Sequence, residues 1–168
     1  MTSRRDLFQK LGRELLQTET SAVVQGHREA SRLPGTPAAE ALVRISRHAE
    51  ASLAELPPSF QYGGSLGLSP LLGQLFSGIR QLVVDRMTDR ERSYRATLRG
   101  MRHGIDVVRL LAPLARAQRE AAFESWCIEW LYTREELVEQ ATAQLEWFAM
   151  HPRQAIQTST RPLAMSHD

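Results

Sequence analysis

The sequence predicts an all-α domain in which a long crossover joins two antiparallel helical hairpins. Apolar residues recur every three or four positions in four long stretches, and this spacing places them on one face of a helix. The last two of these stretches carry opposite charge. Residues 80–119 hold ten arginines and four acidic residues, whereas residues 120–150 hold seven glutamates and one arginine. Because unlike charges attract, we expect the last two helices to pack against each other in antiparallel orientation.

The first hairpin is predicted over residues 2–56. Its first helix covers residues 2–32, and the inward positions step by three and four residues: Phe8, Leu11, Leu15, Thr18 and Ala22. Pro34 and Gly35 stop this helix, and Thr36 supplies an N-cap ahead of Pro37 at the first position of the next. The second helix has the inward positions Leu42, Ile45, Ala49, Ser52 and Leu56, and two prolines end it. The short turn predicts a tight antiparallel pair.

The segment that follows the first hairpin has a different composition. Residues 57–70 contain three glycines, three prolines and two aromatic residues, which is too irregular for a helix and too apolar for a disordered linker. Ser69 and Pro70 then open a shorter helix with a broad apolar face. We therefore interpret the segment as an ordered crossover that contains one short extra helix.

The third long helix is predicted to start at Thr88, which forms a capping-box pattern with Glu91. Its inward positions alternate steps of four and three residues: Tyr94, Leu98, Met101, Ile105, Val108, Ala112 and Ala115. Pro113 is expected to bend or end this helix. Residues 116–120 are then expected to form the turn into the last helix.

The last helix is predicted from a second apolar seam, consisting of Phe123, Cys127, Trp130, Leu137, Ala141, Leu145 and Phe148. Thr133 and Glu136 repeat the capping-box pattern, which predicts a kink within the helix. Pro152 closes it. A single domain is therefore expected over residues 1–152, followed by a flexible C-terminal tail over residues 153–168.

Composition restricts the compartment and the partners. The formal net charge is only +2 because the basic and acidic blocks cancel, so net charge gives no indication of nucleic-acid binding. No apolar run approaches the roughly 18 residues of a membrane span. The first ten residues contain no apolar core of a signal peptide. We expect a cytoplasmic protein without membrane contact and without a nucleic-acid partner.

Two hairpins joined by such a crossover resemble the ferritin-like superfamily, and in particular its small bacterial domains of unknown function. The residues that carry this resemblance are the run GGSLGL at positions 63–68 and the apolar stretch that continues to position 84. The resemblance covers roughly residues 3–150 and implies a four-helix bundle. Where a metal centre is present in this superfamily, two helices each give a glutamate and the other two each give a Glu-x-x-His pair.

This sequence contains no Glu-x-x-His pair. A divergent metal site would have to draw on four candidate ligands: Glu14, Glu29, His48 and Glu124. Glu29 has a structural alternative: the first helix extends beyond the core at this point, or Arg44 or Arg47 of the second helix neutralises the carboxylate. His103 and Asp106 form a reversed pair, but they lie away from the apolar seam and are expected to be solvated.

Other chemistries find less support in the sequence. Cys127 lies on the apolar seam of the last helix, where a thiol is inert. The glycines of the crossover have neither a lysine nor a preceding strand, so they do not predict a phosphate-binding loop. An arginine stripe on the third long helix, formed by Arg92, Arg95, Arg99, Arg102 and Arg109, has the acidic last helix as its expected counterpart rather than nucleic acid.

The three tryptophans Trp126, Trp130 and Trp147 cannot share one narrow seam, so at least one is expected to reach the crossover or another subunit. Two hypotheses follow. The first is a bundle without cofactor or enzymatic activity that acts through protein contacts, as a scaffold, regulator or stress-associated protein, and that forms a homodimer. The second is a divergent ferritin-like protein that binds iron or manganese, or an oxidoreductase that uses these metals.

Overall fold

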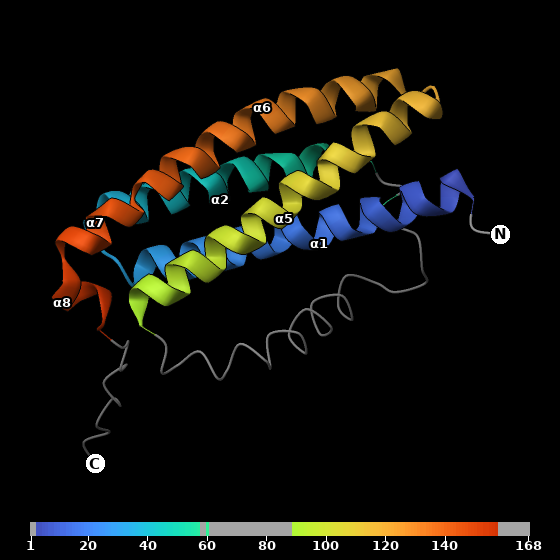
Figure 1. The fold of residues 1–168 in the computed structure, drawn as a ribbon. Helices are drawn as coiled ribbons and strands as arrows, with labels where there is room; N and C mark the ends of the chain where they lie inside the picture. The colour runs from blue at the N-terminus through green and yellow to red at the C-terminus, as the bar shows by residue number, and fades with distance from the viewer. Residues whose placement is uncertain (1–2, 58–59, 61–88, 158–168) are drawn as a thin grey trace, which may run out of the picture.

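The structure is a computed structural model that describes residues 3–57, residue 60 and residues 89–157 (Figure 1). Four long helices account for most of this part: α1 (Arg4–Ser31), α2 (Pro37–Glu55), α5 (Arg90–Ala117) and α6 (Ala121–Ala143). Two short helices follow, α7 (Leu145–Met150) and α8 (Pro152–Ala155). These ranges contain no β-strand, which confirms the prediction of an all-α chain.

The four long helices lie side by side, and each runs antiparallel to its two neighbours (Figure 1). In the α1–α5 pair, Arg32 near the end of α1 contacts Ser93 near the start of α5. In the α5–α6 pair, Arg116 near the end of α5 contacts Glu124 near the start of α6. The predicted antiparallel pairing of the basic and acidic helices is therefore confirmed. It brings opposite charges together along the α5–α6 contact.

The first hairpin forms as its local signals predict. Thr36 is the N-cap of α2, its hydroxyl accepts a hydrogen bond from the Ala39 amide at 3.2 Å, and Pro37 occupies the first turn. Close packing holds α1 against α2 at Gly26, where any Cβ atom would overlap the Ser46 hydroxyl. That hydroxyl donates to the Ala22 carbonyl at 3.3 Å. The two helices can approach this closely because Gly26 has no side chain.

Helix α2 ends at the opposite end of the molecule from the start of α5 (Figure 1). Pro57 and Asp89 therefore lie at opposite ends of the described helices. The predicted crossover and its short helix fall between these two residues, and apart from Phe60 they lie outside the described residues. Phe60 itself packs at the end where α2 stops, against Gly12 of α1 and the rings of Phe8 and Phe123.

Three predicted helix breaks differ from the structure. Pro113 does not end α5, which continues to Ala117; this proline is exposed, and a proline removes only one backbone hydrogen bond of a helix. Helix α6 continues through Thr133 to Ala143, and the helical run is interrupted instead at Gln144. The N-cap of α5 is Asp89, without a side-chain cap hydrogen bond, and Thr88 lies outside the described residues.

The turn between α5 and α6 lies where the sequence predicts it. Arg119 adopts a left-handed backbone with φ of 64°. The Glu120 amide donates to the Ala115 carbonyl at 3.0 Å, and the Arg119 amide donates to the Arg116 carbonyl at 3.1 Å. This pair of hydrogen bonds is a Schellman motif, in which the left-handed position is usually glycine.

The core lies along the shared axis of the four long helices. Most predicted seam residues are buried, but Leu111 rather than Ala112 is buried on α5, and Val138 rather than Leu137 is buried on α6. Tyr94 closes the end near α7, where its hydroxyl donates to the Ala141 carbonyl at 2.8 Å. Beyond Pro152, where the sequence predicts the tail to begin, α8 follows and Ala155 packs against the core.

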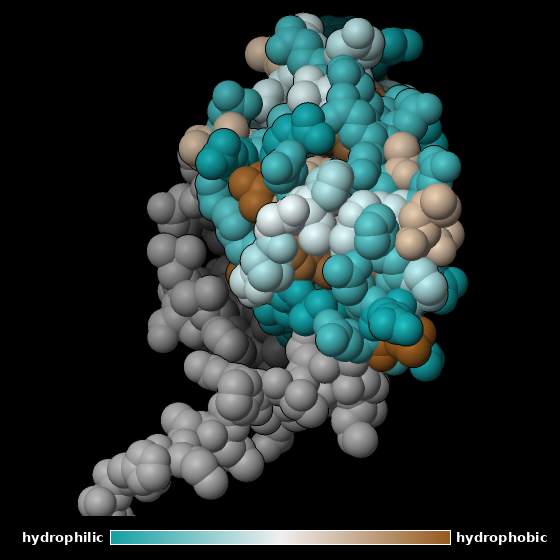
Figure 2. Space-filling view, turned by 90° about the vertical axis from the view of Figure 1, so that its left-hand side faces the viewer, coloured by the Kyte–Doolittle hydropathy of each residue, from teal (hydrophilic) through white to brown (hydrophobic). Residues whose placement is uncertain are grey.

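Figure 2 views the molecule from the end that carries α7 and α8. Hydrophilic residues cover most of the coloured surface there, and hydrophobic residues show as small separate areas. Met150 of α7 and Ile156 after α8 are exposed. This end therefore presents no single broad apolar surface among the residues that the structure describes.

Candidate functional site

A buried ion pair joins the first and last long helices in the core. Glu19 lies on α1 and Arg134 lies on α6, and their side chains are 0% and 1% exposed. The Arg134 Nη1 atom donates to Glu19 Oε1 at 3.0 Å, and Nη2 donates to Oε2 at 2.7 Å. This bidentate geometry is the strongest form of an arginine–carboxylate contact. We call it the Glu19–Arg134 pair.

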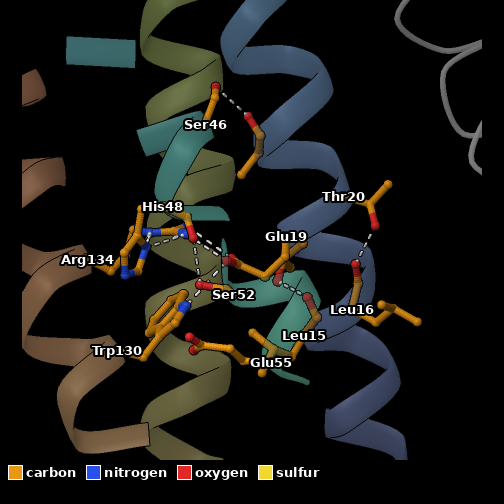
Figure 3. A network of polar contacts seen from close by, with 12 residues as sticks. Leu15, Leu16, Glu19, Thr20, Ser46, His48, Ser52, Glu55, Trp130 and Arg134 are labelled. Carbon is orange, nitrogen blue, oxygen red and sulfur yellow. Dashed lines mark hydrogen bonds and ion pairs between the residues drawn. The ribbon is translucent and has the colours of Figure 1, made fainter. Parts of the chain in front are cut away.

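His48 of α2 and Trp130 of α6 belong to the polar network around this pair, and so does the Ser52 hydroxyl of α2, which hydrogen-bonds to Glu19 (Figure 3). The Arg134 Nε atom donates to His48 Nδ1 at 3.1 Å, and the Trp130 indole N–H donates to Glu19 Oε2 at 3.3 Å. The guanidinium carbon of Arg134 also lies 4.6 Å from the centroid of the Trp130 ring. Three helices are therefore linked at one level of the core through these side chains.

Burial sets the protonation of this network. It raises the pKa of Glu19, and the Arg134 charge opposes that rise. Burial, aided by the nearby Arg134 charge, also lowers the pKa of His48 to about 4, so His48 is neutral at pH 7. Because an arginine can only donate, Nδ1 of His48 must accept, and the single ring proton is therefore on Nε2.

This protonation pattern limits what the site can do chemically. Neither nitrogen of His48 offers a free lone pair while the contact to Arg134 is made, and a metal ion needs such a lone pair. Both Glu19 oxygens already accept charge-assisted hydrogen bonds from Arg134. A divalent cation brought to this place would also meet the positive guanidinium. The arrangement is therefore suited to holding three helices together rather than to binding a cation.

The four candidate metal ligands of the sequence occupy separate places, and each contacts a basic side chain. Glu14 of α1 contacts the exposed His103 of α5, with 2.9 Å between Oε1 and Nε2. Glu124 of α6 accepts from Arg116 Nε at 2.6 Å. His48 contacts Arg134 as described above. Glu29, the fourth candidate, also lies apart from these three, so the candidate ligands do not form one site.

Glu29 of α1 is buried, with 1% of its side chain exposed, and two arginines of its own helix end neutralise it. Arg32 Nη1 donates to both carboxylate oxygens, at 3.1 and 3.0 Å, and Arg28 donates to Oε1 at 3.3 Å. The same Arg32 nitrogen donates to the Ser93 hydroxyl at 2.9 Å. The alternative pairing with Arg44 or Arg47 is therefore wrong, because the partners lie on α1 itself.

The other side chains that could bind a metal ion or act as nucleophiles do not cluster in the described part of the chain. Among the described residues, no three or more His, Cys, Asp or Glu side chains gather closely enough to hold a metal ion. Cys127 is buried, and burial raises the pKa of its thiol to about 12. His103 and Asp106 are both exposed, as the sequence predicts. His48, by contrast, is half-buried.

Sequence reasoning missed Glu19 and Arg134. The predicted seam of the last helix jumps from Trp130 to Leu137, whereas the buried positions are Phe123, Cys127, Trp130, Arg134, Val138 and Ala141. Arg134 is the single basic residue between positions 120 and 150, and it lies one turn after Trp130. That isolated positive charge on an acidic helix was the available signal.

The tryptophans divide between the core and its edges. Trp130 is buried, whereas Trp126 is half-buried, stacks on Phe123 and donates its indole N–H to Glu55 at 2.8 Å. Because Phe123 contacts Phe60, the aromatic cluster of α6 reaches the start of the crossover. Phe123, rather than one of the tryptophans, makes the contact with Phe60, and Tyr62, the other aromatic residue of that segment, lies outside the described residues.

Comparisons with protein-family models, with curated proteins and with solved structures find no match to this chain. The interpretation of the site therefore depends on its own residues. In the part of the chain that the structure describes, no helix is long and apolar enough to cross a membrane. This agrees with the absence of a long apolar run in the sequence.

Proposed function

We propose that this chain is a ferritin-like four-helix bundle that carries no metal centre and acts in the cytoplasm through protein contacts, as a scaffold, regulatory or stress-associated protein that forms a homodimer. The antiparallel order of the four long helices supports the ferritin-like assignment. So does the distance along the molecule between the end of α2 and the start of α5. A long connection of this kind is typical of that superfamily.

The observation that carries the proposal is the position of Arg134. In a di-metal bundle the inward-facing carboxylates of the helices share the positive charge of two metal ions. Here the inward-facing carboxylate is Glu19, and the guanidinium of Arg134 takes the place of a cation beside it. The other deeply buried carboxylate, Glu29, is neutralised by Arg28 and Arg32. The buried negative charges of the described core are therefore already balanced.

Native mass spectrometry of untagged protein, purified without a chelator, tests this function. A mass equal to two copies of the polypeptide without added metal supports the proposal. An added mass of one or two iron or manganese ions per chain would overturn it in favour of a divergent metal-binding protein or oxidoreductase. In that case Glu14, Glu29, His48 and Glu124 would be the residues to replace first.

The same spectra should be recorded for the Glu19→Gln variant. If a metal depends on the core carboxylate, this variant loses the added mass while a control with Glu40→Gln, at an exposed glutamate of α2, retains it. If no metal is bound, both variants give the same mass as the polypeptide. The pair of variants therefore separates a core site from adventitious surface binding.

A further inference from the structure

The contact between α5 and α6 leaves a shallow groove on the outside of the molecule. Its volume is about 470 Å³. The buried side chains Ile105 and Val138 form its floor. Its rim is charged and comprises Arg102, Asp106, Arg109, Glu135, Glu139 and Thr142. We call the groove and its rim the α5–α6 face.

The two sides of this face carry opposite charge. The α5 side presents Arg102 and Arg109, and the α6 side presents Glu135 and Glu139, all of them exposed. Arg109 donates to Glu135 at 2.9 Å across the groove. Asp106 is the exception on the α5 side, and it lies 3.7 Å from Arg109. Exposed charges of this kind remain free to contact a second partner from outside.

Large apolar side chains adjoin the charged groove. Ile128 and Tyr132 of α6 are 54% and 76% exposed, and they lie one turn apart. Ile128 stands two turns before Glu135, so it is on the side of α6 that faces the groove. Exposed tyrosine and isoleucine beside charged residues are typical of a protein interface.

We propose that a second copy of this chain docks on the α5–α6 face, with a two-fold axis that runs parallel to the helices. Such an axis places α5 of each copy against α6 of the other, so basic residues meet acidic residues at both contacts. An axis perpendicular to the helices within the interface would place α5 against α5, where arginines repel. The proposal rests on the homodimer of the proposed function and specifies its interface.

The two-fold axis also fixes how Arg109 and Glu135 of the two copies are placed relative to one another. Rotation about an axis parallel to the helices does not change the level of a residue along them. Arg109 and Glu135 lie at one level because they contact each other. In the dimer their four copies therefore surround the axis with alternating charge, and each Arg109 has a glutamate on both sides.

A charge-exchange experiment tests this interface. Sedimentation velocity of the full chain should show a dimer that weakens as salt is raised. Arg102→Glu puts an acidic side chain on α5 opposite Glu139 of the other copy, and Glu139→Arg puts a basic side chain on α6 opposite Arg102. Each variant alone should therefore dimerise at least about tenfold more weakly. Mixing the two variants should restore a dimer, because α5 of one then opposes α6 of the other with unlike charge at both contacts.

Arg47→Glu on the exposed side of α2 is the matched control, and it should leave dimerisation unchanged. Circular dichroism should confirm that every variant remains helical. A monomeric wild type, or a dimer that neither charge reversal weakens, would overturn the interface. These outcomes do not bear on the metal content, so failure of the interface and failure of the metal-free assignment are separately visible.

Discussion

Arginine and glutamate meet in two settings in this molecule, and burial separates them. In the core, Arg134 and Glu19 are almost fully buried and contact each other through two hydrogen bonds. On the surface, Arg109 and Glu135 are 57% and 44% exposed and contact each other through one. Desolvation makes the buried charges interdependent, because neither can be left without the other. The exposed charges can each return to water, so their pairing contributes little to stability.

Removing one partner of the Glu19–Arg134 pair should destabilise the fold more than any other single change proposed here. Arg134→Met should lower the free energy of unfolding by about 3–5 kcal/mol, because it leaves a buried carboxylate without its counter-charge. Urea denaturation followed by circular dichroism measures this loss. The double variant Glu19→Leu with Arg134→Met should recover most of it, since no buried charge then remains. A single variant as stable as the double variant would contradict the account.

The second-largest effect is expected at Glu29, which is buried but whose partners lie nearer the surface. Glu29→Ala should lower the free energy of unfolding by about 1.5–3 kcal/mol, because charge-assisted hydrogen bonds from Arg28 and Arg32 are lost. The cost should be smaller than at Arg134, since the released arginines can reach solvent. Thermal unfolding of Glu29→Ala beside Glu40→Ala, an exposed glutamate of α2, measures the difference. Equal melting temperatures would refute it.

The stability of the core network should depend on pH through His48. Its folded pKa of about 4 lies below the unfolded value of roughly 6.5, so the unfolded chain binds the proton more readily between these limits. Stability should therefore fall as the pH drops from about 6.5 to about 4, by about 1–2 kcal/mol after allowance for solvent screening of this half-buried ring. Urea titrations across this range measure the slope.

The control for that titration is His48→Gln, which retains an acceptor for Arg134 but cannot titrate. The exposed His27 and His103 contribute equally to both proteins, so the difference between the two slopes belongs to His48. If both proteins lose stability at the same rate over this range, the neutral state assigned to His48 is incorrect.

The smallest effect is expected at the surface pair. Arg109→Met should change the free energy of unfolding of the monomer by only about 0.2–1 kcal/mol, because the partly hydrated Glu135 tolerates the loss. It is the same substitution as Arg134→Met, so the two unfolding curves compare burial directly. A loss as large as that of Arg134→Met would remove the distinction between the two settings.

The sequence alone determined the elements whose signals are local. Thr36 and Pro37 start α2 because the cap and its hydrogen-bond partner are three residues apart. The apolar periodicity placed the four long helices, and the charge blocks of residues 80–119 and 120–150 predicted that α5 and α6 run antiparallel. Each of these signals lies within one or two adjoining segments, so the sequence displays them directly.

The tertiary structure decided which polar side chains are buried and what they contact. From the sequence alone, Arg134 resembles an ordinary surface charge of an acidic helix. Its partners Glu19 on α1 and His48 on α2 are 115 and 86 residues away along the chain, so only the tertiary structure reveals them. Pro113 and Thr133 resemble helix breaks in the sequence, yet α5 and α6 continue through them. The free energy of a buried charge depends on neighbours from distant segments, and only the assembled helices bring those neighbours together.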